Sequence, residues 1–199
     1  MDINKVHIFD DFLPIEVINK MEDQLGKIPF RFAKNLDEQF LTPEIKVKDS
    51  DLTNINRPGL LQCWAFENNQ WDLSINAQWT EEILKHLPFE YELQRVKINF
   101  NYQVPRYYED KCMHPHCDMN EKGFTAIYYL NDSDGDTIIF NEKTMDPFLN
   151  GEELSIKKRI NNKKGRFVMF NQDYLHAGML PINSDYRVVI NFNFKIIWK

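Results

Sequence analysis

The sequence predicts a mainly β fold, a jelly roll with flanking α-helices. From residue 96 onward, short apolar or alternating segments follow one another at close intervals. We expect strands at 96–102, 113–119, 124–131, 136–141, 152–159, 165–170, 174–179 and 186–197. Turn-forming residues separate these strands, most clearly at 131–135 and 150–151. Eight strands are enough for two facing sheets around an interior site, which is the jelly-roll arrangement.

The N-terminal half carries a helical pattern between less regular stretches. Residues 7–13 predict a short strand. A helix then begins at Pro14, a residue that suits a first helical turn, and continues to Leu25 before Gly26 ends it. Its apolar side chains recur at helical spacing, at Val17, Ile18, Met21 and Leu25. Residues 30–58 have no clean period, and we expect an irregular segment that shapes or covers the functional site.

A further strand and helix precede the predicted jelly roll. Residues 60–66 predict the strand, and residues 77–87 predict an amphipathic helix that Pro88 ends. The tryptophans of this region are expected to pack in the core, with an aromatic substrate platform as the alternative; they are Trp64, Trp71 and Trp79. Residues 96–102 then alternate apolar and polar side chains, as a half-buried strand does.

The chain is expected to fold as a single domain over residues 1–199. With 43% hydrophobic residues in a length of 199, it can bury one sizeable core. No internal repeat and no low-complexity linker divides it. We therefore expect residues 1–95 to form a helical and irregular support, and residues 96–199 to form the jelly-roll core.

Charge and composition argue against several kinds of partner. The net charge of −6 disfavours nucleic acid, which usually recruits a basic face, and the basic residues at 157–159 and 163–164 are expected at a solvated hairpin tip. No apolar run approaches the roughly 20 residues that span a bilayer. An odd count of three cysteines and a polar start without a signal peptide indicate free thiols in a reducing, cytoplasmic setting. The sequence leaves the oligomeric state open.

A His-x-Asp pair with a distant histidine and arginine is the most informative pattern in the chain. On an extended strand, side chains at i and i+2 point to one face, so His116 and Asp118 can reach one metal ion together. His176 offers a second imidazole. Two imidazoles and one carboxylate leave coordination positions open, which suits non-haem Fe(II) enzymes that bind a co-substrate and O2. The planar, charged guanidinium of Arg187 suits a carboxylate of such a co-substrate.

With these residues in place, the segment 102–194 resembles the core of the 2-oxoglutarate- and Fe(II)-dependent dioxygenases, nearest to the prolyl 4-hydroxylase-like branch. The run Ile127-Tyr128-Tyr129-Leu130-Asn131 is similar to the strand that follows His-x-Asp in the hypoxia-factor prolyl hydroxylases. The run 165–170 before His176-Ala177-Gly178 also matches the family pattern. The resemblance covers about half of the chain.

The resemblance implies a double-stranded β-helix, the cupin-like form of the jelly roll. It implies that His116, Asp118 and His176 bind iron, with no catalytic side chain beyond these ligands. The cofactors would be Fe(II), 2-oxoglutarate as co-substrate, and O2, with ascorbate as an optional supporting reductant. The activity would be hydroxylation of an unactivated C–H bond with release of succinate and CO2.

The resemblance also implies a co-substrate site. Arg187 would hold the distal carboxylate of 2-oxoglutarate, and Tyr129 would donate its hydroxyl to the same carboxylate. Ile127, two residues before Tyr129 and on the same strand face, would line the site. A tyrosine on the strand before His-x-Asp often joins this site in the family; Tyr102 is favoured here, and Tyr107 is the alternative.

Two neighbours of the motif allow more than one interpretation. His114 falls on the same strand face as His116, so it would rim the site or compete as a ligand, although a solvent-facing position is the expected one. Cys117 lies between the two ligands and is expected to point away from the metal.

The substrate is the least constrained part of the prediction. The likeness at 127–131 favours a prolyl residue of a protein or peptide, and a small molecule or free amino acid is the alternative. A nucleic-acid demethylase is disfavoured because Asn193 occupies the place where that branch has a second arginine. A non-catalytic jelly-roll protein that binds metal is the remaining alternative from a different class.

Overall fold

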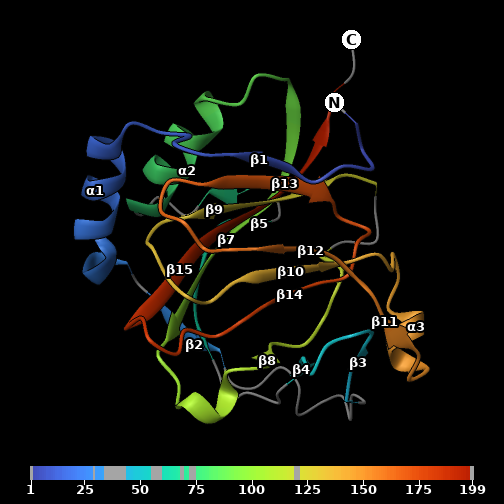
Figure 1. Cartoon of the computed structure of the whole chain (residues 1–199). Helices are drawn as coiled ribbons and strands as arrows, with labels where there is room; N and C mark the ends of the chain where they lie inside the picture. The colour runs from blue at the N-terminus through green and yellow to red at the C-terminus, as the bar shows by residue number, and fades with distance from the viewer. Residues whose placement is uncertain are drawn as a thin grey trace.

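The computed structural model describes residues 2–28, 30–33, 44–54, 60–67, 70–71, 75–118 and 122–197. A large and a small β-sheet dominate it (Figure 1). The large sheet has eight strands in the order β1-β13-β9-β15-β7-β5-β2, with β6 paired to β5. Its strands are β1 (His7–Phe9), β13 (Phe167–Asn171), β9 (Phe124–Tyr129), β15 (Tyr186–Ile196), β7 (Tyr91–Tyr102), β5 (Leu60–Glu67), β2 (Arg31–Ala33) and β6 (Gln70–Trp71).

The small sheet has the order β12-β10-β14, with β12 at Ile156–Ile160, β10 at Thr137–Phe140 and β14 at His176–Gly178. The segment around β8 (Lys111–Cys112) continues this sheet only through isolated bridges of Cys112 to Met179 and of His116 to His176. The regular strand predicted at 113–119 is therefore wrong in extent. Pro115 lacks the N–H that a continuous ladder needs, which explains why pairing stops and resumes around it.

Helices cover the outer face of the large sheet. Helix α1 (Ile15–Asp23), a 3₁₀ turn (Leu25–Lys27) and α2 (Ile75–Lys85) match the predicted helices within two residues. They lie beside the large sheet in Figure 1 and share one buried cluster with it, which includes Ile18, Met21, Trp79, Ile83, Val96, Ile98, Tyr128, Ile190 and Phe192. The indole Nε1–H of Trp79 donates to Gln24 Oε1 at 3.0 Å, so this tryptophan packs in the core as expected. The side chains of Trp64 and Trp71 lie outside the described residues.

The two sheets enclose a second apolar cluster between them. It joins Ile127, Tyr129, Val168, Phe170 and Val189 of the large sheet to Ile139 and Ile160 of the small sheet. The outer face of the small sheet packs against a third cluster with α3 (Asp146–Leu149), β11 (Glu153–Leu154) and β3 (Lys46–Val47). The predicted jelly roll is confirmed. The layers that pack outside its two sheets come mainly from the N-terminal half.

Strand alternation decides which side chains enter the space between the sheets. On β7, Val96, Ile98 and Phe100 face the helices, so Asn99 and Asn101 face the small sheet. Asn101 pairs with Arg187 of β15, which places both on the inner face.

The remaining differences concern short elements. The strand predicted at 152–159 is split, because β11 pairs with β3 while β12 pairs with β10. Short strands β2, β3 and β4 (Thr53–Asn54) lie within the segment 30–58 that was predicted to be irregular. Residues 34–43 and 55–59 lie outside the described part, so the expectation that this segment covers the functional site stays a prediction.

Residues 157–159, predicted at a hairpin tip, lie instead on strand β12. Three of the five basic residues at 157–159 and 163–164 pair with acidic groups: Arg159 Nε lies 2.6 Å from Asp136 Oδ2, just before β10, Lys163 Nζ lies 3.3 Å from Asp10 Oδ2, and Lys164 pairs with Glu22. Among the described helices, none is long and apolar enough to cross a membrane.

Candidate metal and co-substrate site

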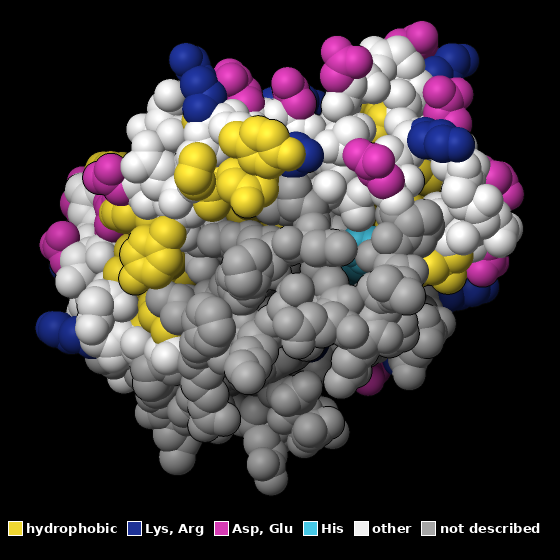
Figure 2. All heavy atoms as spheres, turned by 90° about the horizontal axis from the view of Figure 1, so that it is seen from below, with side chains coloured by type: hydrophobic (Ala, Val, Ile, Leu, Met, Phe, Trp, Pro, Cys, Tyr) yellow, Lys and Arg dark blue, Asp and Glu magenta, His cyan; other side chains and the backbone are white. Residues whose placement is uncertain are grey.

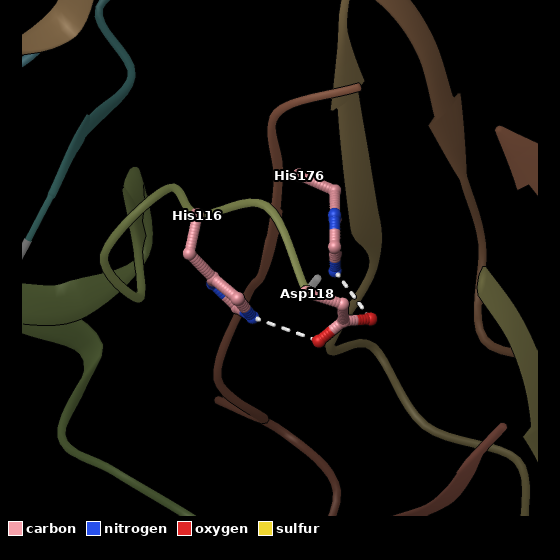
Figure 3. A group of neighbouring side chains, drawn as sticks. All are labelled: His116, Asp118 and His176. Atoms are coloured by element: carbon pink, nitrogen blue, oxygen red, sulfur yellow. Dashed lines mark ion pairs between the residues drawn. The ribbon is translucent and has the colours of Figure 1, made fainter. Parts of the chain in front are cut away.

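His116, Asp118 and His176 converge between the two sheets, as Figure 3 shows. One ligand atom from each residue lies within 4.8 Å of the others. His176 stands on β14, and the bridge between His116 and His176 sets the two imidazoles side by side with ring centroids 4.6 Å apart. Asp118 follows two residues after His116. Within the described part of the chain, this is the one group of three such residues arranged to hold an ion.

Backbone carbonyls fix the tautomer of both histidines. His116 donates Nδ1–H to the carbonyl of His114 at 3.0 Å, and His176 donates Nδ1–H to the carbonyl of Tyr174 at 3.1 Å. In the neutral rings, the lone pairs of both Nε2 atoms are therefore available. They lie 3.8 and 3.5 Å from the two oxygens of Asp118, and the buried His176 Nε2 has no hydrogen-bond partner. Lone pairs facing a carboxylate repel one another unless a cation lies between them, and this donor set fits Fe(II).

The protonation states also suit a metal. The pKa of His116 falls below its usual range, because the part of its ring that faces the triad is desolvated and His176 lies beside it. Burial by itself would raise the pKa of Asp118, but His176 and His116 in their protonated forms, together with Arg95, lower it well below its usual range. A neutral imidazole and an ionised carboxylate are the forms that bind metal.

Three polar residues that the sequence did not single out as ligand partners hold Asp118. Arg95 Nη2 donates to Asp118 Oδ1 at 2.5 Å, Thr125 Oγ1 donates to Oδ2 at 2.9 Å, and Asn193 Nδ2 donates to Oδ2 at 3.1 Å. These partners come from β7, β9 and β15. No sequence signal pointed to these roles; Asn193, six residues after Arg187, served in the sequence analysis only to disfavour a nucleic-acid demethylase.

Arg187 is buried on β15, with 2% of its surface exposed. Its Nε donates to the Gly135 carbonyl at 2.7 Å and its Nη2 to Thr137 Oγ1 at 3.0 Å. No carboxylate of the described residues lies within ion-pair distance of it. Burial lowers the pKa of Arg187, and a guanidinium enclosed in this way has the chemistry to bind an anion.

Two glycines make room for this guanidinium. A Cβ on Gly135 would lie 2.6 Å from Arg187 Cδ, and a Cβ on Gly178 would lie 3.3 Å from Arg187 Nη1. Gly178 follows His176 by two residues on β14, so the arginine head lies about 6–7 Å along that strand from the histidine. That separation suits a short dicarboxylate bound at both ends.

Tyr129 and Ile127 lie where the sequence placed them, on the inner face of β9. Both are buried in the cluster between the sheets. The Tyr129 hydroxyl donates to Thr137 Oγ1 at 2.7 Å, and the Arg187 Cζ lies 5.9 Å from the Tyr129 ring centroid. Thr137, which sequence reasoning missed, therefore links Tyr129 to Arg187.

Tyr102 does not join this group. It lies on the opposite face of β7, 58% exposed, with its ring 4.8 Å from that of Phe100. Tyr107, the alternative, is 75% exposed and packs on Tyr108. The inner-face neighbour is Asn101, which pairs with Arg187 and is fully buried with neither amide atom hydrogen-bonded.

The two neighbours of the motif are also placed. His114 turns away from the triad, its Nδ1 lies 3.2 Å from Asn54 Nδ2, and its ring contacts Phe148 with centroids 4.6 Å apart. The Cys117 thiol donates to the carbonyl of Asp173 at 3.2 Å and takes no part in the metal group, as predicted. His116 is the accessible ligand, with 44% of its side chain exposed. On the face seen from below, histidine atoms reach the surface (Figure 2).

The comparisons with known proteins agree with this geometry. Residues 102–195 match the family model of the 2OG-Fe(II) oxygenase superfamily. No curated protein matches the sequence. Among solved structures, the fold is similar to a prolyl-4-hydroxylase from Pseudomonas putida, with 13% identity and a TM-score of 0.52 over 96% of this chain and 93% of that chain.

Two other solved structures have comparable similarity. A prolyl hydroxylase from Trichoplax adhaerens, in complex with a peptide of the oxygen degradation domain of hypoxia inducible factor, has 13% identity and a TM-score of 0.54 over 96% of this chain and 84% of that chain. A non-haem α-ketoglutarate-dependent carbocyclase from nogalamycin biosynthesis has 10% identity and a TM-score of 0.58 over 96% and 79%. At these identities the similarity shows a shared fold.

Proposed function

We propose that the chain is a 2-oxoglutarate-dependent dioxygenase of the 2OG-Fe(II) oxygenase superfamily, whose family model matches residues 102–195, and that its Fe(II) is bound by His116, Asp118 and His176. One observation carries the proposal. Two imidazole Nε2 atoms and one carboxylate face each other within 4.8 Å, and the buried His176 Nε2 has no other partner. Such a set leaves about three coordination positions for a co-substrate and O2.

Arg187 binds the distal carboxylate of 2-oxoglutarate in this proposal. Its buried charge, its position near Gly178 and the absence of an ion pair within the described residues support that role. Thr137 accepts from both Arg187 and Tyr129, so its own hydroxyl proton is left to donate to the same carboxylate. Ile127 and Val189 supply the apolar wall beside them.

Bound together, iron, 2-oxoglutarate and O2 supply the oxidising chemistry, which hydroxylates an unactivated C–H bond and releases succinate and CO2. The side chains of this chain position and shield the reactants. Carbonyls of His114 and Tyr174 orient both imidazoles and keep Nδ1 as the donor nitrogen, and Arg95 and Thr125 keep Asp118 ionised and oriented. No side-chain acid or base is required.

The proposed substrate is a prolyl residue of a protein or peptide. The run 127–131 supports it, as does the similarity to prolyl hydroxylases, one of which is bound to a peptide. A small molecule or free amino acid is the second candidate, which the similarity to the carbocyclase favours.

Uncoupled turnover of 2-oxoglutarate tests the activity itself. Purified protein with Fe(II), ascorbate and O2 should convert 2-oxoglutarate to succinate, and a chelator should stop the reaction. Failure of the iron-loaded protein to form succinate would favour a non-catalytic metal-binding protein. The two substrate classes are then separated by incubating the enzyme with proline-containing peptides and with free amino acids. The true substrate gains the mass of one oxygen atom.

A further inference from the structure

Asp118 rests on a row of three side chains from adjacent strands of the large sheet. Asn193 of β15 is the Cα partner of Arg95 on β7 and of Thr125 on β9. Residues directly opposite one another in a sheet present their side chains on the same face. Arg95, Asn193 and Thr125 therefore stand in one line across the inner face, beneath Asp118.

The hydrogen bonds within this row determine one another. A guanidinium has only donors, so the oxygen of the Asn193 amide must face Arg95, whose Nε lies 2.8 Å from Asn193 Oδ1. The amide nitrogen then faces the other way, toward Asp118 Oδ2 at 3.1 Å and Thr125 Oγ1 at 3.1 Å. The Thr125 hydroxyl accepts from Asn193 and so directs its own proton to Asp118 Oδ2, at 2.9 Å.

The row fills most of the acceptor capacity of the carboxylate. An ionised carboxylate offers about four lone-pair positions, two on each oxygen. Thr125 and Asn193 occupy both positions on Oδ2, and Arg95 occupies one of the two on Oδ1. The position that remains belongs to Oδ1, which lies 3.8 Å from His116 Nε2. Oδ2 lies 3.5 Å from His176 Nε2, but its two positions are already filled by donors.

We propose that Arg95, Asn193 and Thr125 form a clamp that makes Asp118 a one-oxygen metal ligand. A carboxylate that bound the metal through both oxygens would take one of the open positions that a chelating co-substrate and O2 require. By filling Oδ2 with donors, the clamp keeps those positions open. The three residues are positioning residues, because they act on the metal only through Asp118.

Arg95 also balances charge at the proposed metal site. It balances the single negative charge of Asp118, whose side chain is only 2% exposed, so the carboxylate is compensated without a cation. The ligand is thus held in its binding geometry before a metal arrives. Preorganisation of this kind reduces the cost of binding.

The inference rests on the proposed metal site, and the test separates the two. Mn(II) is the probe, and the relaxation rate of water protons counts its exchangeable water ligands. Wild-type protein should hold about three waters on Mn(II), since three of the six positions of an octahedral ion are then filled by protein. In Thr125→Val the loss of the hydroxyl frees a position on Oδ2, Asp118 binds through both oxygens, and the count should fall to about two.

Three variants accompany this experiment. Thr125→Ser keeps the hydroxyl and should restore the wild-type water count. Thr137→Val removes a buried hydroxyl that contacts Arg187 and not Asp118, so it should also keep the wild-type count. Asn193→Ala removes the other donor to Oδ2 and replaces Thr125→Val if that variant does not fold.

The outcomes are distinct. If wild-type protein binds no Mn(II), or if His176→Ala binds it equally well, the proposed metal site is wrong and the clamp with it. If wild-type protein binds Mn(II) with about three waters and a folded Thr125→Val or Asn193→Ala protein holds the same number, the metal site stands and the clamp is overturned.

Discussion

The guanidinium of Arg187 meets the hydroxyl of Thr137, with 3.0 Å between Nη2 and Oγ1, at a depth where 2% of the arginine surface is exposed. A buried cation held by one hydroxyl and one carbonyl, with no carboxylate of the described residues in contact, is incompletely compensated. A carboxylate that binds to the guanidinium supplies the missing negative charge. Co-substrate binding should therefore depend strongly on this residue.

Replacing Arg187 by Ala should weaken 2-oxoglutarate binding far more than metal binding. A hydrogen bond to a charged group contributes about 1.5–3 kcal/mol, so the KM for 2-oxoglutarate should rise roughly 10- to 150-fold. Arg187→Lys should recover only part of this, because lysine lacks the planar fork. Arg106→Ala, at an exposed arginine that pairs with Glu109, serves as the control. An unchanged KM in Arg187→Ala would remove this residue from the co-substrate site.

Gly135→Ala should disturb the same site without altering any charge. The new Cβ would lie 2.6 Å from Arg187 Cδ and 2.9 Å from the Met179 carbonyl, so the arginine side chain must shift. We expect a loss of about 1–3 kcal/mol in the free energy of unfolding and an increase in the KM for 2-oxoglutarate. Gly26→Ala, where a Cβ meets nothing within 4 Å, should leave the KM unchanged. Equal KM values for the two variants would mean that Arg187 need not occupy this position.

Asn101→Leu tests whether the Asn101 amide binds 2-oxoglutarate or instead stabilises the fold. The buried amide of Asn101 has no hydrogen-bond partner, so replacing it by an apolar side chain should not lower the melting temperature of the protein without ligand. Binding of 2-oxoglutarate, measured calorimetrically, should weaken about 2- to 10-fold, as expected for the loss of a neutral hydrogen bond. Tyr102→Phe, on the outer face, should bind normally. If Tyr102→Phe bound 2-oxoglutarate more weakly and Asn101→Leu did not, Tyr102 would belong to the co-substrate site, as the sequence predicted.

Asn101 and Tyr102 show which features the sequence can predict and which it cannot. The alternation correctly predicted a strand that ends at Tyr102, but the strand begins at Tyr91 and not at residue 96. The half-buried character was wrong, because Asn99 and Asn101 on the polar face are also buried, against the small sheet. The alternation does not say which face carries the site, and Tyr102 has the same parity as Val96, Ile98 and Phe100, which pack under the helices. Asn101 has the parity of Arg187, its partner across β7 and β15, and that pairing exists only once the sheet is formed.

The residues of the candidate site also fall into those that the sequence could predict and those that it could not. His116, Asp118 and His176 were predictable because metal ligation restricts residue type and spacing, and Arg187 because a buried carboxylate requires its fork. Arg95 lies 23 positions before Asp118 and meets it only through strand order. Ordinary hydroxyl and amide residues such as Thr125 and Asn193 carry no sequence signal of their role, since the same types occur throughout strands and turns.

A carboxylate far from the metal site should govern part of the acid sensitivity of the fold. Burial alone would raise the pKa of Asp134, but backbone N–H groups of residues 182–184 donate to it, and its pKa lies below the usual 3.8. Because the folded-state pKa is the lower one, the stabilisation is complete above pH 3.8 and is lost as the pH falls through the folded value.

Asp134→Asn should therefore be less stable than wild type at neutral pH, and the difference should narrow at about pH 2. Urea unfolding at the two pH values measures it. Glu152→Gln, at an exposed carboxyl, should show little difference at either pH. A constant gap between Asp134→Asn and wild type across the pH range would mean that the carboxylate charge does not contribute.

The proposed metal centre is tested most directly by succinate formation in His176→Ala beside wild type and His114→Ala, all loaded with Fe(II). His176 Nε2 is the buried, unpartnered ligand atom, whereas the His114 ring packs on Phe148 away from the triad. We predict succinate from wild type and His114→Ala, and none above background from a folded His176→Ala protein. Wild-type rates of succinate formation in His176→Ala would contradict the assignment of the iron site.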